Sequence, residues 1–263
     1  MQSPKISSAD RPRITVVTVV YNGAATLRET IESVLMQTYN NVEYIIIDGG
    51  SNDGTLNVIK EYAPRIAKWI SEKDGGIYNA MNKGVALASG SYVNFMNCGD
   101  RFAAPDVLEK VAQEASEQTS DILYGDVLIA GREGAPWLKA AKKDIKVMHH
   151  IPFCHQSTFA KTSLLKRFSF DEKYKMSADF KFFKQCFLEK CSFAKVDFPI
   201  AIFGTSGISN TQRTSGLREN NAVVRELDSF PEKWIYLGRT NFVLLWMAVR
   251  KFFKKYRNEV NAE

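Results

Sequence analysis

Four aspartates stand where their carboxylates could do chemistry. Asp48, Asp74 and Asp100 each lie just beyond a short apolar run, and Asp179 opens a segment with helical spacing. In an open parallel sheet the loops at the carboxyl ends of the strands converge, and ligands bind there. A carboxylate in such a place can hold a divalent cation or take a proton from a hydroxyl. Any one of these residues could instead cap a turn or a helix, but three at successive strand ends favour a binding site.

The elements that must position these residues alternate between strand and helix. Runs of β-branched and other apolar residues predict buried strands at 14–20, 42–47, 66–70, 92–96 and 121–124. Apolar residues at helical spacing predict helices at 24–35, 55–62, 77–88 and 104–116. This alternation indicates βαβ units, and therefore an α/β fold with a mainly parallel central sheet flanked by helices.

The second half of the chain is less regular. Residues 125–146 are expected to be rich in loops. Beyond them we predict strands at 153–160 and 193–196 and helices at 178–189, 211–227 and 234–256. The helix at 178–189 places Phe182, Phe183, Cys186 and Phe187 on its apolar side.

The composition is that of an ordinary soluble globular protein. The 263 residues include 35 basic and 29 acidic ones, a formal charge of +6 that by itself does not indicate a nucleic-acid partner. The four cysteines match no zinc-site spacing and are too few for a disulfide scaffold, which favours a reducing, cytoplasmic setting. The polar N-terminus does not resemble a signal peptide, and no apolar run reaches the roughly 18 residues of a membrane span.

Five ordered segments carry a resemblance to a known family. They are TVVYN (18–22), DGGSNDGT (48–55), SEKDGGIYNAMNKG (71–84), GSYVNFMNCGD (90–100) and MSADF (176–180). They resemble the successive motifs of family 2 glycosyltransferases, and most closely the branch that builds bacterial exopolysaccharide, colanic acid and O-antigen repeat units. The resemblance covers roughly residues 13–205. It implies the GT-A fold of nucleotide-diphospho-sugar transferases and an inverting transfer of a sugar from a nucleotide-diphosphate sugar to a hydroxyl.

The resemblance also implies which residues bind the donor. Thr18 and Tyr21 fall where the family contacts the nucleoside base, and Asp48 lies at the neighbouring acidic position. Some relatives carry a second acid directly after it, where this chain has Gly49. Asp74 matches the acid that the family uses near the nucleotide. Lys83 follows on a predicted helix, where it could reach a phosphate or simply be a solvated surface lysine.

Two further acids take the metal and catalytic positions of the family. Asp100 is the one acid that remains of its D-x-D metal motif, here Asn97-Cys98-Gly99-Asp100, and implies a single carboxylate holding Mg²⁺ or Mn²⁺. Asp179 matches the catalytic base, which removes a proton from the acceptor hydroxyl as it attacks. His155 lies in a segment that lines the acceptor side, where it could touch a substrate or be a structural histidine. Residues 204–209 resemble a flexible segment near the donor, either a lid or a plain loop.

The C-terminal segment has the composition of an interfacial helix. Residues 242–249 are apolar but too short to cross a bilayer, and residues 239–257 contain six basic residues and no acid. Aromatic residues between basic ones are typical of helices that lie on anionic lipid. A lipid-linked saccharide acceptor would require such a surface, which places the chain in the cytoplasm, peripheral on the inner face of the cell membrane. The alternative is a helix packed on the catalytic domain.

These expectations give a domain map and exclude two rivals. The map is a flexible N-terminus at 1–13, a GT-A catalytic domain at 14–210 and a helical C-terminal extension at 211–263. The first strand–helix turn, YNGAAT, lacks the G-x-G-x-x-G of a nucleotide-binding oxidoreductase and the Gly-rich basic loop of a cytidylyl-type transferase. The reduced D-x-D motif leaves open an inactive nucleotide-sugar-binding protein of the same fold.

Overall fold

The structure is a computed structural model, and it describes residues 11–131, 135–143, 145, 150–204 and 213–260. For residues 251–260 it describes the backbone alone. The chain divides into two compact units, Met1–Gly207 and Ile208–Glu263.

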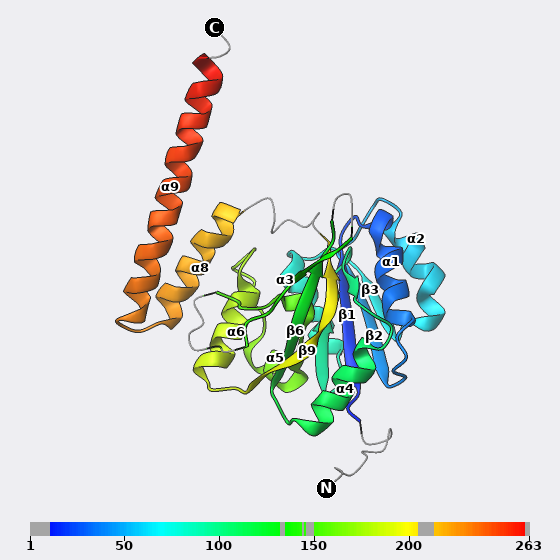
Figure 1. Cartoon of the computed structure of the whole chain (residues 1–263). Helices are drawn as coiled ribbons and strands as arrows, with labels where there is room; N and C mark the ends of the chain where they lie inside the picture. The colour runs from blue at the N-terminus through cyan, green and yellow to red at the C-terminus, as the bar shows by residue number, and fades with distance from the viewer. Residues whose placement is uncertain (1–10, 132–134, 144, 146–149, 205–212, 261–263) are drawn as a thin grey trace. The chain divides into compact units, whose positions relative to one another are not determined.

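The first unit begins with a parallel βαβ arrangement (Figure 1). Its strands are β1 (Ile14–Val20), β2 (Val42–Asp48), β3 (Lys68–Ser71) and β4 (Tyr92–Phe95). The connecting helices are α1 (Ala24–Leu35), α2 (Thr55–Tyr62) and α3 (Ile77–Leu87). All seven elements confirm the prediction, with ends displaced by at most two residues.

The sheet reverses its strand order between β1 and β4. The order is β3-β2-β1-β4-β8-β6-β9-β5, so β2 and β3 extend to one side of β1 and the chain then returns to place β4 on the other side. Both β2 and β4 pair in parallel with β1. The carboxyl ends of β1 and β4 therefore leave the sheet side by side, at the kind of switch point where α/β sheets bind ligands.

Beyond β4 the sheet becomes mixed. The strand β8 (Thr158–Lys161) is antiparallel to β4 and to β6 (Ile122–Ile129), while β9 (Phe193–Phe203) is parallel to β6. Two short strands, β5 (Arg101–Phe102) and β7 (Trp137–Lys139), pair antiparallel with β9 and β6. The 3-10 turn η3 (His155–Ser157) leads directly into β8.

Helices cover both faces of the sheet. On one face α1, α2 and α4 (Val107–Glu117) bury Leu27, Ile31, Ile59 and Val111 against Val16 and Ile46 of the strands. On the other face lie α3, α5 (Thr162–Phe168) and α6 (Ala178–Leu188), where Gly84 of α3 approaches Val17 closely. As predicted, α6 buries Phe182, Phe183 and Cys186, whereas Phe187 is only partly buried.

The expectation that residues 125–146 are rich in loops was wrong at their start. The strand β6 runs on through Gly125 to Ile129, and β9 extends to Phe203 beside it. A Cβ atom on Gly125 would lie 2.8 Å from the carbonyl oxygen of Phe198, so only glycine fits where the two strands change register. A glycine inside a strand often marks such a close backbone approach. In the sequence, Gly125 resembles the glycine of a turn, which is why the loop was expected to begin there.

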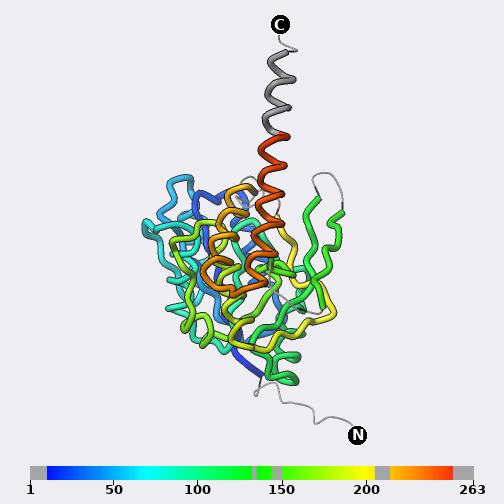
Figure 2. Tube along the Cα trace, turned by 90° about the vertical axis from the view of Figure 1, so that its left-hand side faces the viewer, coloured from blue at the N-terminus to red at the C-terminus, as the bar shows by residue number. Residues whose placement is uncertain are grey.

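The second unit contains two helices, α8 (Arg213–Leu227) and α9 (Glu232–Val260). They lie side by side over the first turns of α9 (Figures 1 and 2), and the Asn221 amide donates to the side-chain oxygen of Asn241. In the part of the chain that the structure describes, no helix is both long and apolar enough to cross a membrane.

A buried carboxylate ties the strands together at the end of the sheet opposite the switch point. Glu43 of β2 is almost fully buried and accepts hydrogen bonds from the Thr15 hydroxyl, from the Ser89 N–H and hydroxyl, and from Lys68. Burial alone raises the pKa of Glu43, but the bonds from Ser89, Thr15 and Lys68 outweigh it and lower the pKa from 4.5 to about 2.

Replacing Glu43 by Gln should lower the free energy of unfolding by about 3 kcal/mol at pH 7, since a carboxyl pKa lowered on folding contributes about 1.4 kcal/mol per pKa unit. The amide keeps the shape of the side chain but turns one of its two acceptor oxygens into a donor, which then faces the donors of Ser89 and either Thr15 or Lys68. Because the folded pKa is the lower one, this contribution is lost as the pH falls from 4.5 toward 2, and the two proteins should converge in acid. Urea unfolding at pH 7 and pH 3 measures both effects. The exposed Glu117→Gln is the control, and an equal loss in both variants would contradict the assignment.

Candidate active site

The loops that follow β1 and β2 are locked together at the switch point. The Asn22 N–H donates to the Ser51 hydroxyl, and the Asn52 N–H donates to the side-chain oxygen of Asn22. Asp53 accepts from the N–H groups of Ala24, the first residue of α1, and of Thr55, the first residue of α2. Asp53 therefore caps two helices, as carboxylates at helix N-termini commonly do.

The loop after β4 approaches the loop after β1. A Cβ atom on Gly23 would lie 2.5 Å from Sγ of Cys98, and the Thr26 hydroxyl lies 3.4 Å from the same sulfur. The Thr30 hydroxyl of α1 donates to the backbone oxygen of Asp100. The Asn97–Asp100 turn is thereby held against α1, which fixes the one acid that remains of the expected metal motif.

Thr18 and Asp48 are both fully buried. The Thr18 hydroxyl donates to the Met96 oxygen and lies 3.0 Å from the Tyr44 hydroxyl. The Asp48 carboxylate accepts from the Ser51 N–H and hydroxyl and from the Ser71 hydroxyl. These contacts favour structural roles, and a base contact by either side chain would require the loops above it to open.

The other expected donor residues have more varied settings. Tyr21 is 66% exposed at the end of β1, free to stack on a planar ligand. Asp74 accepts from the Gly76 N–H, and a Cβ atom on Gly49 would lie 2.6 Å from its Oδ2. Position 49 therefore lies directly against the Asp74 carboxylate. Lys83 of α3 pairs with Glu72 at 2.7 Å, so its charge is already partly balanced.

Asp100 has an unusual electrostatic setting. Its side chain is buried, and Oδ1 accepts from the Gly204 N–H at the end of β9. Burial raises the pKa of Asp100 to about 6, against the lowering influence of the Gly204 N–H, of His155 and of Gln156. A cation beside this carboxylate would supply the compensating charge that the protein itself does not provide in full.

The same turn offers a second oxygen. Oδ1 of Asn97 is buried and has no hydrogen-bond partner among the described residues, which is an uncommon state for a buried amide oxygen. A carboxylate and an amide oxygen in one turn fit Mg²⁺ or Mn²⁺, whose shell is commonly completed by phosphates and water. Within the described residues, no three His, Cys, Asp or Glu side chains come together as a ready-made metal cage.

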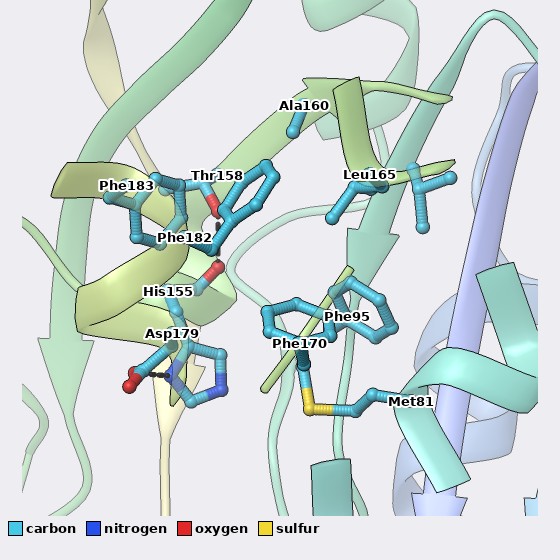
Figure 3. Close-up of a pocket in the computed structure, with 11 residues that line it drawn as sticks. Met81, Phe95, His155, Thr158, Ala160, Leu165, Phe170, Asp179, Phe182 and Phe183 are labelled. Carbon is cyan, nitrogen blue, oxygen red and sulfur yellow. Dashed lines mark hydrogen bonds and ion pairs between the residues drawn. The ribbon is translucent and has the colours of Figure 1, made fainter. Parts of the chain in front are cut away.

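Asp179 and His155 meet at the edge of an apolar pocket (Figure 3). The Tyr78 hydroxyl donates to Oδ1 of Asp179 at 2.9 Å, and Nδ1 of His155 lies 3.3 Å from Oδ2. On the other side of the imidazole, Nε2 of His155 lies 3.2 Å from Nδ2 of Asn97. One histidine ring therefore connects the start of α6 with the turn after β4.

Two members of this group were missed in the sequence. Tyr78 lies within the segment 71–84, but a tyrosine early in a helix resembles any core aromatic. Asn97 carries no charge, and nothing in the sequence indicated a role for it in the expected metal motif. The segment 205–209, expected to form a lid or a loop with Gly204, lies outside the described residues.

Comparison with known proteins decides the family. The profile described as Glycosyl transferase family 2 matches residues 15–184, which contain the sheet from β1 to β8 and most of α6. The chain belongs to glycosyl transferase family 2. It is a glycosyltransferase by family, and the resemblance seen in the five sequence motifs is confirmed.

The relatives of this family 2 chain include mycobacterial glycosyltransferases. An uncharacterised glycosyltransferase of Mycobacterium tuberculosis is 30% identical over 213 residues, covering 78% of this chain and 80% of that protein. A PGL/p-HBAD biosynthesis glycosyltransferase of Mycobacterium bovis is 31% identical over 181 residues, 67% of this chain and 70% of its own length.

Solved structures confirm the GT-A fold. S. aureus TarS 1-349 in complex with UDP-GlcNAc matches with a TM-score of 0.65 at 18% identity, over 85% of this chain and 69% of that one. A mannosyltransferase of Pyrobaculum calidifontis in complex with GDP-Man and Mn²⁺ also has a TM-score of 0.65 at 18% identity, over 90% of this chain and 71% of that one.

Replacing Asp100 by Asn should stabilise the metal-free family 2 chain, because it removes a carboxyl whose pKa rises from 3.8 to about 6 on folding. The raised pKa means that the folded state disfavours the charge, so the cost is absent below pH 3.8 and complete above pH 6. At pH 8 we expect a gain of up to about 3 kcal/mol in the free energy of unfolding, narrowing as the pH falls toward 4. Thermal and urea unfolding in EDTA measures it, and a less stable variant at pH 8 would overturn this reading of the site.

Proposed function

We propose that this chain is an inverting glycosyltransferase that moves a sugar from a nucleotide-diphosphate sugar to a hydroxyl. The catalytic domain is residues 14–210. The observation that carries the proposal is the imidazole of His155, which spans from Asn97 in the candidate metal turn to Asp179 at the start of α6. The carboxylate that would act on the acceptor and the turn that would hold the metal ion for the leaving group are therefore separated by one imidazole ring.

In this proposal Asp179 acts as the base. Its carboxylate takes the proton from the acceptor hydroxyl while that oxygen attacks the anomeric carbon. The bond from this carbon to the diphosphate oxygen breaks with inversion, and the nucleoside diphosphate leaves with the electron pair. Mg²⁺ or Mn²⁺, held by Asp100 and Asn97, would offset the charge of the leaving diphosphate.

The donor is bound at the open edge of β1, β2 and β3. Tyr21 stacks on the nucleoside base, and Asp74 lies near the nucleotide. We also propose Thr18, Asp48 and Lys83 as members of the donor site. Thr18 and Asp48 are buried, so they could contact the donor only if the loops above them open. Lys83 could contact it only if its ion pair with Glu72 breaks. Both neighbouring enzymes named above were solved with nucleotide sugars, one of them with Mn²⁺, which supports this assignment.

We further propose that residues 211–263 hold the chain on an anionic membrane surface, at the inner face of the cell membrane, where it meets a lipid-linked saccharide in surface polysaccharide biosynthesis. The described part of α9 presents an exposed apolar stripe at helical spacing, made of Ile235, Phe242, Leu245, Trp246 and Val249.

The opposite side of α9 is the buried one. Tyr236, Leu237 and Thr240 are buried there, and Tyr236 bonds to Asn220 of α8. The stripe therefore points away from α8. The six basic residues of 239–257 favour anionic lipid over a second copy of the same cationic helix.

The catalytic proposal predicts divalent-metal-dependent turnover that needs Asp179. With Mn²⁺ or Mg²⁺, the chain should release nucleoside diphosphate from at least one of UDP-glucose, UDP-galactose, UDP-GlcNAc and GDP-mannose, and EDTA should abolish release. Asp179→Asn should lower kcat at least about a hundredfold, the usual worth of a general base, with little change in the donor KM.

Asp197→Asn, at an exposed position on β9, is the matched control and should behave as wild type. Retained turnover in Asp179→Asn would remove that residue as the base. An absence of release from every donor would favour the inactive binding protein of the same fold.

The membrane proposal predicts that α9 binds vesicles through its apolar stripe. Wild-type protein should sediment with phosphatidylcholine vesicles only when they contain phosphatidylglycerol, and salt should weaken the binding. Leu245→Asp should reduce the partition coefficient about fiftyfold, since it removes a buried leucine and adds a repelled charge. Ala248→Asp, exposed but outside the stripe, adds the same charge and should cost only about fivefold. Equal losses, or no binding to the anionic vesicles, would sink the proposal.

A further inference from the structure

His155 joins the two ends of the candidate site. Its ring lies between two polar side chains, Asn97 at 3.2 Å from Nε2 and Asp179 at 3.3 Å from Nδ1. Its backbone is fixed as well, because the Thr158 hydroxyl donates to the His155 carbonyl oxygen at 2.6 Å (Figure 3).

The atom that faces Nε2 determines which ring nitrogen carries the proton. The structure turns Nδ2 of Asn97 toward Nε2, and an NH₂ group donates, so in this orientation of the amide Nε2 accepts. In a neutral imidazole the proton then sits on Nδ1, the ring nitrogen that lies 3.3 Å from Oδ2 of Asp179. Asn97 thereby selects the one neutral tautomer that can donate to Asp179.

The two oxygens of Asp179 have separate partners. Oδ1 accepts from the Tyr78 hydroxyl and from the Phe180 N–H, while Oδ2 faces His155. An ionised carboxylate has about four acceptor sites, so these three contacts leave room for an acceptor hydroxyl. The pair borders an apolar pocket lined by Phe170, Phe182 and other apolar side chains, where a hydrogen bond is stronger than in water.

We propose that His155 is a positioning residue: its Nδ1–H, selected by Asn97, holds the Asp179 carboxylate in the orientation that receives the acceptor proton. The inference rests on the proposed function in that Asp179 is taken as the base. In this role His155 acts through Asp179 and not on the reacting atoms. A catalytic group displaced by about 1 Å can lose about a hundredfold in rate, which is why such a contact matters.

The tautomer can be tested without any activity. The chain has three histidines, so the imidazole nitrogens are few enough to assign, with His155→Asn as the reference spectrum. We expect ¹⁵N NMR of the full chain at pH 8 to show His155 as a neutral ring protonated on Nδ1. A ring protonated on Nε2, or an even mixture of the two tautomers, would overturn the selection by Asn97.

Kinetics with three His155 variants test the positioning role. In His155→Asn the amide nitrogen lies where Nδ1 was, in His155→Gln it lies farther out, and His155→Leu has no donor. With the best donor from the release screen, we expect kcat to fall between about tenfold and a hundredfold in the Leu and Gln variants. His155→Asn should recover to within about fivefold of wild type, and the donor KM should stay unchanged in all three.

A double variant separates positioning from a general structural effect. If His155 acts only through Asp179, then His155→Leu adds no further loss in an Asp179→Asn background. A further tenfold loss there, equal loss in the Asn and Gln variants, or full activity in His155→Leu would each overturn the proposal.

These outcomes are distinct from a failure of the proposed function. If wild type releases nucleotide and His155→Leu releases it at the same rate, only the positioning role is rejected. Wild type without release would reject the proposed function, and Asp179→Asn with full release would reject Asp179 as the base. Circular dichroism and thermal unfolding verify folding, and if His155→Leu does not fold, the comparison of the Asn and Gln variants decides the matter.

Discussion

The return of β4 to the side of β1 is the constraint on which the rest of this molecule depends. Parallel pairing of β1 with both β2 and β4 makes three strands end at one edge of the sheet. The turn Asn97–Asp100 is thereby brought against α1 and the loop of β1, and η3, which precedes the neighbouring β8, brings His155 to Asn97. Residues that are far apart in the chain therefore lie close together because the strands that carry them are neighbours in the sheet.

Three buried carboxylates in one sheet show how the surroundings decide what an acid can do. Glu43 and Asp48 are each surrounded by hydroxyl and N–H donors, so their charge is satisfied inside the protein and serves stability. Asp100 has fewer donors, and burial raises its pKa, so its charged form destabilises the folded protein. An acid whose charge destabilises the fold is the kind of residue expected at a functional site.

The sequence predicted the alternating first half well, because buried parallel strands and amphipathic helices leave strong periodic patterns. The four aspartates could be singled out for the same reason, since three stand at or just beyond the ends of such strands and Asp179 begins such a helix. It failed at Gly125, where a glycine required by close strand contact looked like a turn. It also could not reveal that Thr18 points into the core, or that Tyr78 and Asn97 share a network with Asp179 and His155, because such contacts join residues that have no fixed spacing.

The contact between Gly49 and Asp74 couples two residues that lie 25 positions apart in the chain. A Cβ atom at position 49 would lie 2.6 Å from Oδ2 of Asp74 and 3.1 Å from its Cγ, so any larger residue there requires the Asp74 side chain to turn away. Turning it away would break the hydrogen bond that Asp74 accepts from the Gly76 N–H just before α3. The absence of a side chain at position 49 is therefore what sets the direction in which the Asp74 carboxylate points.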